Sequence, residues 1–137
     1  MATMNAKVVW QDNVHFIGTS HSGHDVQIDG EKQHGASPME LILLGLGGCA
    51  SYDVVTILKK SRQVVHDVRC EMTAKRADAV PAVYTDIHLH FVVTGENIKE
   101  SQVAKAIELS AEKYCSASRM LSAGGVNITH DFEIIAG

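Results

Sequence analysis

The segment 41–58 constrains the fold most, because it is 18 residues long and carries only one charged side chain, Asp53. A helix start precedes it, with an N-cap residue, a proline at the first helical position and a glutamate placed to complete a capping box. These residues are Ser37, Pro38 and Glu40. We predict a helix that runs to about Lys60, roughly 35 Å long at 1.5 Å per residue.

The apolar side chains of this segment point to all sides of the predicted helix. A helix that is apolar all round must be buried all round. One sheet and one further helix cannot cover a rod of this length, so we predict an obligate, intertwined homodimer. The alternative for such an apolar run is a membrane span. Three glycines and the charge of Asp53 argue against insertion, and no second span exists in the sequence.

Length and charge restrict the class of protein. A chain of 137 residues predicts one domain over residues 1–137 with a substantial core. The net charge is −4 and the basic residues are scattered, which argues against partners such as nucleic acid or anionic membrane. We see no leader peptide at the N-terminus. Three cysteines cannot all pair within one chain, so we expect a reducing compartment and a cytoplasmic protein.

The remaining elements follow from alternating patterns and turn signals. Short strands are predicted at 6–10, 14–18 and 24–29, and longer ones at 64–76, 83–94 and from 126 to 134. A second amphipathic helix follows Asn97 and Glu100, which form a second capping-box candidate. Residues 115–121 either continue this helix or form another turn of it. Strands first and last with helices between predict an α+β fold with antiparallel sheets and two central helices.

Cys49 is the first candidate for chemistry. It follows Gly47 and Gly48 inside a helix, where two glycines cost about 2 kcal/mol relative to alanine. One explanation is that the glycines let a ligand or a second backbone approach closely, which would leave the neighbouring thiol accessible. The other is tight helix packing around a buried cysteine. The pattern alone leaves both open.

Cys115 is the second candidate, and it lies where the amphipathic pattern of the second helix ends. Arg119, one turn further on, would favour a thiolate there. An incidental cysteine is the competing interpretation. Cys70 lies on the apolar side of an alternating strand, and we interpret it as a small buried side chain. Cys49 and Cys115 can form a pair only if their two helices cross.

The eight histidines do not define a metal site. His21 with His24, and His88 with His90, could each supply two ligands, but zinc requires three or four. No glycine-rich phosphate loop follows a strand. We therefore expect no metal and no cofactor.

Three stretches together resemble one family. They are Ser37-Pro38-Met39-Glu40-Leu41, Gly47-Gly48-Cys49 and Tyr114-Cys115-Ser116-Ala117-Ser118. They are similar to the OsmC/Ohr superfamily of osmotically inducible and organic-hydroperoxide-resistance proteins, and the order of elements also agrees. The chain looks closest to the small YhfA-like branch, through the residues 110–115 and 126–130. The resemblance covers essentially the whole chain.

The resemblance implies an interlocked homodimer and a thiol peroxidase (an oxidoreductase of oxidative-stress defence) that acts on organic hydroperoxides. A dithiol, of lipoyl type in the Ohr branch, would be the reductant. Cys49 would be the peroxidatic thiolate that becomes a sulfenic acid. Cys115 would resolve it to a disulfide, which the dithiol reopens. Glu40 and Arg119 would be auxiliary residues.

Two positions depart from the peroxidase members of that family. Those members carry an arginine in the N-terminal strands that holds the reactive thiolate, whereas residues 1–61 contain no arginine. They also carry glutamate directly after the proline of the motif, where this chain has Met39. The arginines at 69, 76 and 119 are the candidates to replace the missing cation. The alternative functions are a binding module for a small hydrophobic or sulfur-containing ligand, without turnover, and a purely structural dimer.

Overall fold

The structure is a computed structural model that describes residues 2–137. The chain forms two compact units, one ending at Leu44 and one spanning Gly45–Gly137. The N-terminal unit holds strands β1 (Lys7–Asp12), β2 (His15–Thr19) and β3 (Asp25–Asp29), and α1 (Pro38–Lys60) begins in it. The C-terminal unit holds the rest of α1, then β4 (Val64–Arg76), β5 (Tyr84–Glu96), α2 (Glu100–Leu109), the π-helical turn η1 (Ser110–Tyr114), α3 (Ser116–Ala123) and β6 (Asn127–Ala136).

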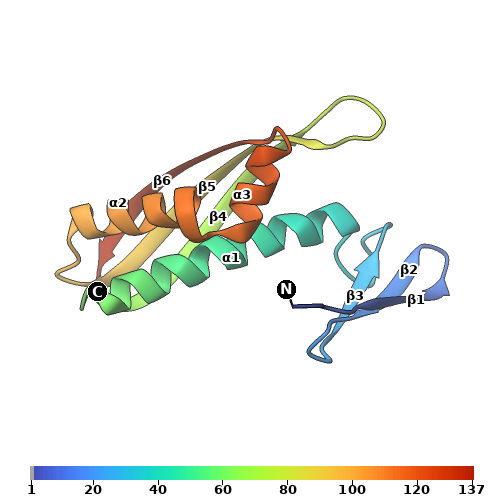
Figure 1. Cartoon of the computed structure of the whole chain (residues 1–137), viewed down its shortest axis with the longest axis horizontal. Coiled ribbons are helices and arrows are strands. Elements are labelled where there is room, and N and C mark those ends of the chain that lie inside the picture. Colours follow the sequence, from blue (N-terminus) through green and yellow to red (C-terminus); the bar gives the residue numbers. More distant parts are fainter. Residues whose placement is uncertain (1) are drawn as a thin grey trace. The chain divides into compact units, whose positions relative to one another are not determined.

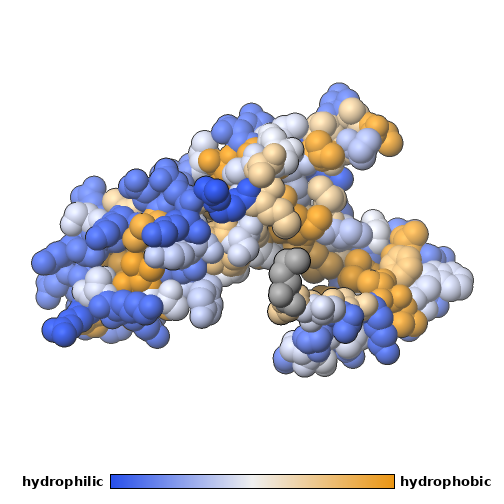
Figure 2. Space-filling view, in the orientation of Figure 1, coloured by the Kyte–Doolittle hydropathy of each residue, from blue (hydrophilic) through white to orange (hydrophobic). Residues whose placement is uncertain are grey.

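The N-terminal unit is built on an antiparallel sheet in the order β1-β2-β3. The register places apolar side chains together on one face, because cross-strand partners share a face. These residues are Val8, Trp10, Phe16, Gly18, Val26 and Ile28. Much of the face is uncovered in the single chain, with Trp10 65% and Val8 61% exposed. Figure 2 shows hydrophobic side chains at the surface over these strands.

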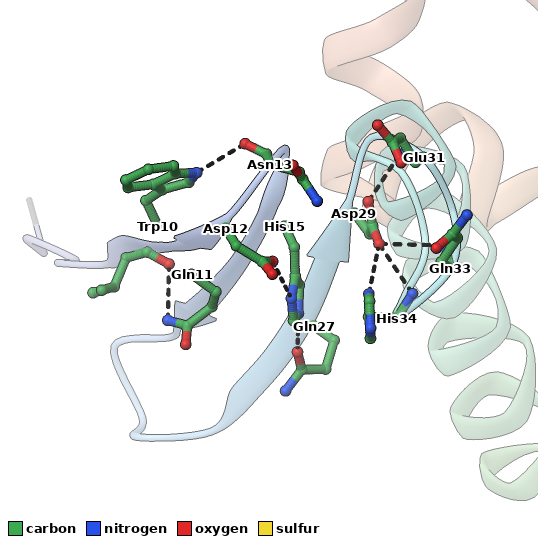
Figure 3. Close-up of polar contacts among 11 residues, drawn as sticks. Trp10, Gln11, Asp12, Asn13, His15, Gln27, Asp29, Glu31, Gln33 and His34 are labelled. Atoms are coloured by element: carbon green, nitrogen blue, oxygen red, sulfur yellow. Dashed lines mark hydrogen bonds and ion pairs between the residues drawn. The ribbon is translucent and has the colours of Figure 1, made fainter.

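A loop between β3 and α1 is folded around the carboxylate of Asp29, which is only 3% exposed (Figure 3). The carboxylate accepts hydrogen bonds from the backbone N–H groups of Glu31, Gln33 and His34, and it also bonds the His34 ring. The backbone donors of Glu31 and His34 contribute most to lowering the pKa of Asp29 to about 2. The loop therefore closes on an ionised side chain and delivers the chain to the start of α1.

The start of α1 has the predicted capping box. The Glu40 carboxylate accepts from the Ser37 backbone N–H at 2.8 Å, and the Glu40 N–H donates to Ser37 Oγ at 3.3 Å. The predicted bounds of this helix are confirmed at both ends, because the cap, the proline and the terminal lysines all agree locally.

The C-terminal sheet has the order β4-β5-β6 and mixed direction. β4 and β5 form a long antiparallel hairpin, whereas β6 pairs parallel to β5, from Asp86↔Asn127 to Gly95↔Ala136. Our prediction of antiparallel sheets is therefore wrong for this pair. The physical reason is the helical connection of residues 97–126, since parallel neighbours need a long crossover. The α+β class is confirmed.

The core of the C-terminal unit lies between this sheet and the helices (Figure 1). The inward face of β5 is buried, as its alternation predicts, through Ile87, Leu89, Phe91 and Val93. One stripe of α1 is buried, formed by Leu46, Ala50, Val54 and Leu58 at intervals of four residues. A Cβ added at Gly47 would lie 2.6 Å from Met72 Cε of β4, so this glycine lets the helix approach the strand.

The crossover helices depart from the sequence prediction at both ends. The N-cap of α2 is Lys99 without a side-chain cap bond, so the capping box proposed for Asn97 is wrong. Asn97 instead adopts a left-handed backbone conformation, with φ of 52°, before the helix begins. At the other end α2 widens into the π-helical turn η1, the backbone becomes extended at Cys115, and α3 starts as a separate helix.

By length and composition α1 is apolar enough to cross a membrane, a test that the core helix of a soluble protein also passes. Its buried stripe against the sheet and its mid-helix Asp53 fit a core helix better than a membrane span. Other apolar side chains of α1 remain exposed in the single chain, among them Tyr52 at 71%.

Candidate functional site

Cys49 lies within α1 and Cys115 lies at the junction of η1 and α3. Cys49 is half-buried and Cys115 is 0% exposed. The extended backbone at Cys115 makes it the N-cap of α3, and its Sγ accepts from the Ser118 N–H at 3.4 Å. The amphipathic pattern therefore ends at position 115 because the helix itself ends there. All three cysteines, with Cys70, are free thiols.

The thiol of Cys49 lies close enough to that of Cys115 to affect its pKa. Burial contributes most to raising the pKa of Cys115 to about 11, against the opposing hydrogen bond from the Ser118 N–H. A hydrogen bond with the Cys49 thiol, and the charge that Cys49 would carry, raise the pKa further. At neutral pH Cys115 is therefore a protonated thiol beside a more accessible one.

Two residues that the sequence analysis did not select complete this site. Ser110 Oγ donates to Asp53 Oδ2 at 3.0 Å and to the Ala50 carbonyl at 3.3 Å. The negative charge of Asp53 also contributes to the raised pKa of Cys115. One sequence signal could have found Asp53: it is the single charge in the apolar segment 41–58 and lies one turn beyond Cys49. Ser110 carried no comparable signal, because its partners lie 57 and 60 residues away.

Cys70 lies on the face of β4 that packs beneath α1, and it is half-buried. Burial contributes most to raising the pKa of Cys70 to about 11; a hydrogen bond with Ser51 opposes this rise and the charge of Glu71 adds to it. We interpreted Cys70 from the sequence as a small buried side chain; in the single chain it is only partly buried.

Within one chain, two of the three candidate arginines bond backbone carbonyls and the third lies on the other face of β4. Arg69 alternates with Val68 and Cys70, so it projects from the opposite face of the sheet. Arg76 Nε donates to the Ala82 carbonyl in the hairpin, and Arg119 Nη1 donates to the Glu112 carbonyl. Arg119 is not among the largest influences on the pKa of Cys115, and its auxiliary role remains a prediction.

Glu40 belongs to the N-terminal unit, where it completes the capping box. Its bonds with Ser37, the backbone one first, hold the pKa of Glu40 below its usual value. The structure thus gives Glu40 a local role at the helix start. Its auxiliary role in chemistry remains a prediction.

Within residues 2–137, no group of three or more His, Cys, Asp or Glu side chains is arranged to hold a metal ion. His88 and His90 lie on one face of β5 and both bond Asp131 Oδ1 of β6, at 2.9 and 2.6 Å. The hydrogen bond with Asp131 contributes most to raising the pKa of His90. These histidines stabilise the parallel strand pair.

A groove with a volume of about 570 Å³ is lined by residues of α2, η1 and β6, among them Ile107, Glu108 and Phe132. Neither Cys49 nor Cys115 lines it. In the single chain, a ligand in this groove would therefore not contact either thiol.

Comparison with known proteins identifies the family. Residues 29–131 match the model of the family described as OsmC-like protein. Protein YhfA of Escherichia coli K12 is 47% identical over 134 residues, which cover 97% of this chain and 99% of that protein. A hypothetical protein from Aquifex aeolicus, known as a crystal structure, is 28% identical, with a TM-score of 0.90 and coverage of 100% of this chain and 99% of that one.

A more distant structure shows the same fold. The organic hydroperoxide resistance protein OhrB of Bacillus subtilis is 15% identical, with a TM-score of 0.63 and coverage of 96% of this chain and 98% of that one. The predicted resemblance is confirmed by the match over residues 29–131 and by the 47% identity to YhfA. The chain belongs to the OsmC-like protein family.

Proposed function

We propose that the chain reduces organic hydroperoxides through Cys49 and Cys115. The observation that supports the proposal is that the half-buried Cys49 lies close enough to the fully buried Cys115 to raise its pKa. Family membership supports a stress-related redox role. Accessibility assigns the roles, because a peroxide from solution meets Cys49 before Cys115.

In this proposal the Cys49 thiolate attacks the distal oxygen of the hydroperoxide and the O–O bond breaks. The alkoxide leaves and takes a proton to become the alcohol, while Cys49 becomes a sulfenic acid. The Cys115 sulfur then attacks the Cys49 sulfur, its proton and the departing hydroxide form water, and a disulfide results. An external dithiol, of lipoyl type in our expectation, supplies two electrons by exchange and restores both thiols.

The proposal includes a cytoplasmic homodimer. A reducing compartment keeps the thiols free between turnovers. A second copy would cover the apolar faces that one chain leaves exposed, including Trp10 of the N-terminal sheet and Tyr52 of α1. It would also bring further charges to the site.

The test is to add one equivalent of cumene hydroperoxide to the reduced protein and map its thiols by peptide mass spectrometry. We expect a Cys49–Cys115 disulfide and an unmodified Cys70. A Cys70→Ser variant should behave as the unaltered chain does, whereas Cys115→Ser should stop at the sulfenic acid of Cys49. Survival of both thiols, under conditions that consume a free thiol in solution, would refute the proposal.

A second function is favoured by the raised pKa of Cys115 and by the carboxylate beside it, since both disfavour thiolate chemistry. In this alternative the chain binds a small hydrophobic or sulfur-containing ligand without turnover. Stabilisation by such a ligand should persist in a double variant, Cys49→Ser with Cys115→Ser. The mapping experiment separates the two functions, because binding alone leaves the disulfide unformed.

A further inference from the structure

We propose that Asp53 and Ser110 are positioning residues of the thiol pair: Ser110 ties Cys115 to α1, and the carboxylate of Asp53 leaves the proton on Cys115. These roles deepen the proposed function and rest on it. They can be tested without a hydroperoxide, because any thiol oxidant and reductant act on the same pair.

The tie passes through a single residue. Ser110 is 1% exposed, and its hydroxyl bonds the Ala50 carbonyl and the Asp53 carboxylate of α1. Its own carbonyl accepts the Cys115 N–H at 2.8 Å, which closes the π-helical turn. π-helical turns occur frequently at functional sites. Cys115 is thus fixed to α1. This helix carries Cys49, which lies one turn before Asp53.

The hydroxyl of Ser110 makes this tie specific. A buried hydroxyl that loses its partners destabilises the fold, so the turn is held in the one arrangement that satisfies it. Without the hydroxyl, η1 keeps its backbone bonds but loses its polar link to α1. The sulfur of Cys115 would then be free to move away from Cys49.

The second part of the idea concerns charge. The groups that face Cys115 are Cys49 and Asp53 from α1, Ser110 from η1 and the Ser118 N–H from α3. From β6, His130 lines a small cavity shared with Ser110 and Ser118. Asp53 is the one carboxylate among these groups. A negative charge close to a sulfur disfavours a second negative charge on it.

This charge has a consequence for the disulfide. Because Cys115 is 0% exposed, an external thiolate attacks the sulfur of Cys49 and forms a mixed disulfide there. The Cys49–Cys115 bond breaks, and its electron pair stays on the Cys115 sulfur until a proton arrives. The second thiol of the dithiol then displaces Cys49 and leaves oxidised. The leaving thiolate forms beside Asp53, so the carboxylate slows this step.

The test uses a Cys70→Ser chain, which retains only the two thiols of interest. Diamide, a two-electron oxidant, closes the disulfide and dithiothreitol opens it, and both rates are followed by alkylation and mass spectrometry. Asp53→Asn keeps an oxygen for the Ser110 hydroxyl but removes the charge. Asp78→Asn, an exposed position in the β4–β5 hairpin, is the matched control for charge.

We expect Asp53→Asn to speed opening by dithiothreitol roughly threefold to tenfold, because a leaving thiol of lower pKa departs faster. Asp53→Glu, which restores the charge, should return the rate toward that of the parent. Ser110→Ala should slow closure by diamide at least about threefold, while Ser122→Ala on the exposed side of α3 should not. An opening rate in Asp53→Asn equal to that in Asp78→Asn overturns the charge assignment.

Closure in Ser110→Ala at the parental rate would overturn the tie. If Ser110→Ala does not fold, the pair Asp53→Asn and Asp53→Glu still decides the charge assignment. Failure of the cumene hydroperoxide reaction would refute the proposed function without touching these rates. The two proposals therefore fail in different experiments.

Discussion

At the scale of residues, the sequence predicts candidate sulfurs more readily than it predicts the groups that surround them. Cys49 and Cys115 could be selected from their flanking patterns, but their proximity depends on a break at position 115 that no local rule supplies. The hydrogen bond between Asp53 and Ser110 could not be predicted, because it joins residues 57 positions apart and depends on how the helices pack. The arginine expected to help Cys115 bonds a backbone carbonyl instead.

The raised pKa of Cys70 predicts a loss of stability in alkaline solution. Burial raises it from 9.0 to about 11, so the folded chain keeps this proton where the unfolded chain has released it. The contribution is fully present below about pH 9 and is lost as the pH rises toward 11. The free energy of unfolding, measured in urea from pH 9 to 11, should therefore decline less steeply with pH in Cys70→Ala than in the parent.

The control for Cys70→Ala is Thr73→Ala, an exposed position on the same strand without a titrating group. Its free energy of unfolding should decline with pH as steeply as that of the parent. An equal slope in the parent and in Cys70→Ala would contradict the assigned pKa. Tyrosines and lysines titrate in the same range, so only the difference between the two slopes is informative.

At the scale of elements, prediction succeeded where the signals are local. The bounds of α1 followed from a cap, a proline and terminal lysines that all lie within the helix or beside it. The predicted start of α2 was wrong. Asn97 has a left-handed backbone conformation, and the N-cap of the helix is Lys99 instead. The direction of β6 was wrong as well, since strand pairing across a 30-residue crossover leaves no local mark.

The capping box at α1 gives a prediction at this scale. Ser37→Ala removes the hydroxyl that accepts the Glu40 N–H, and it should lower the free energy of unfolding by about 1 kcal/mol. Ser101→Ala, at an exposed position of α2, should change it much less. Chemical denaturation of both variants measures the difference. Equal effects of the two substitutions would mean that the cap bond contributes nothing measurable.

At the scale of the whole molecule, a single chain leaves apolar surface uncovered in each of its two units. The N-terminal sheet exposes Val8 and Trp10 on one face, and α1 exposes Tyr52. The α+β class was predictable from the order of elements. The predictions of one domain and of a dimer stay predictions, because they concern contacts that one chain does not contain.

The dimer can be tested at Trp10, whose large side chain would form part of the covered face. We expect sedimentation velocity to show a dimer at micromolar concentration for the unaltered chain. Trp10→Glu places a charge on the apolar face of the sheet and should weaken association by about 2 kcal/mol, roughly thirtyfold in Kd. Val80→Lys, at the hairpin tip, is the matched control for a charge at an exposed apolar position and should leave the dimer intact. A folded monomer of the unaltered chain at micromolar concentration would contradict the predicted dimer. The apolar outer sides of α1 would then be stable in water without a second copy to bury them.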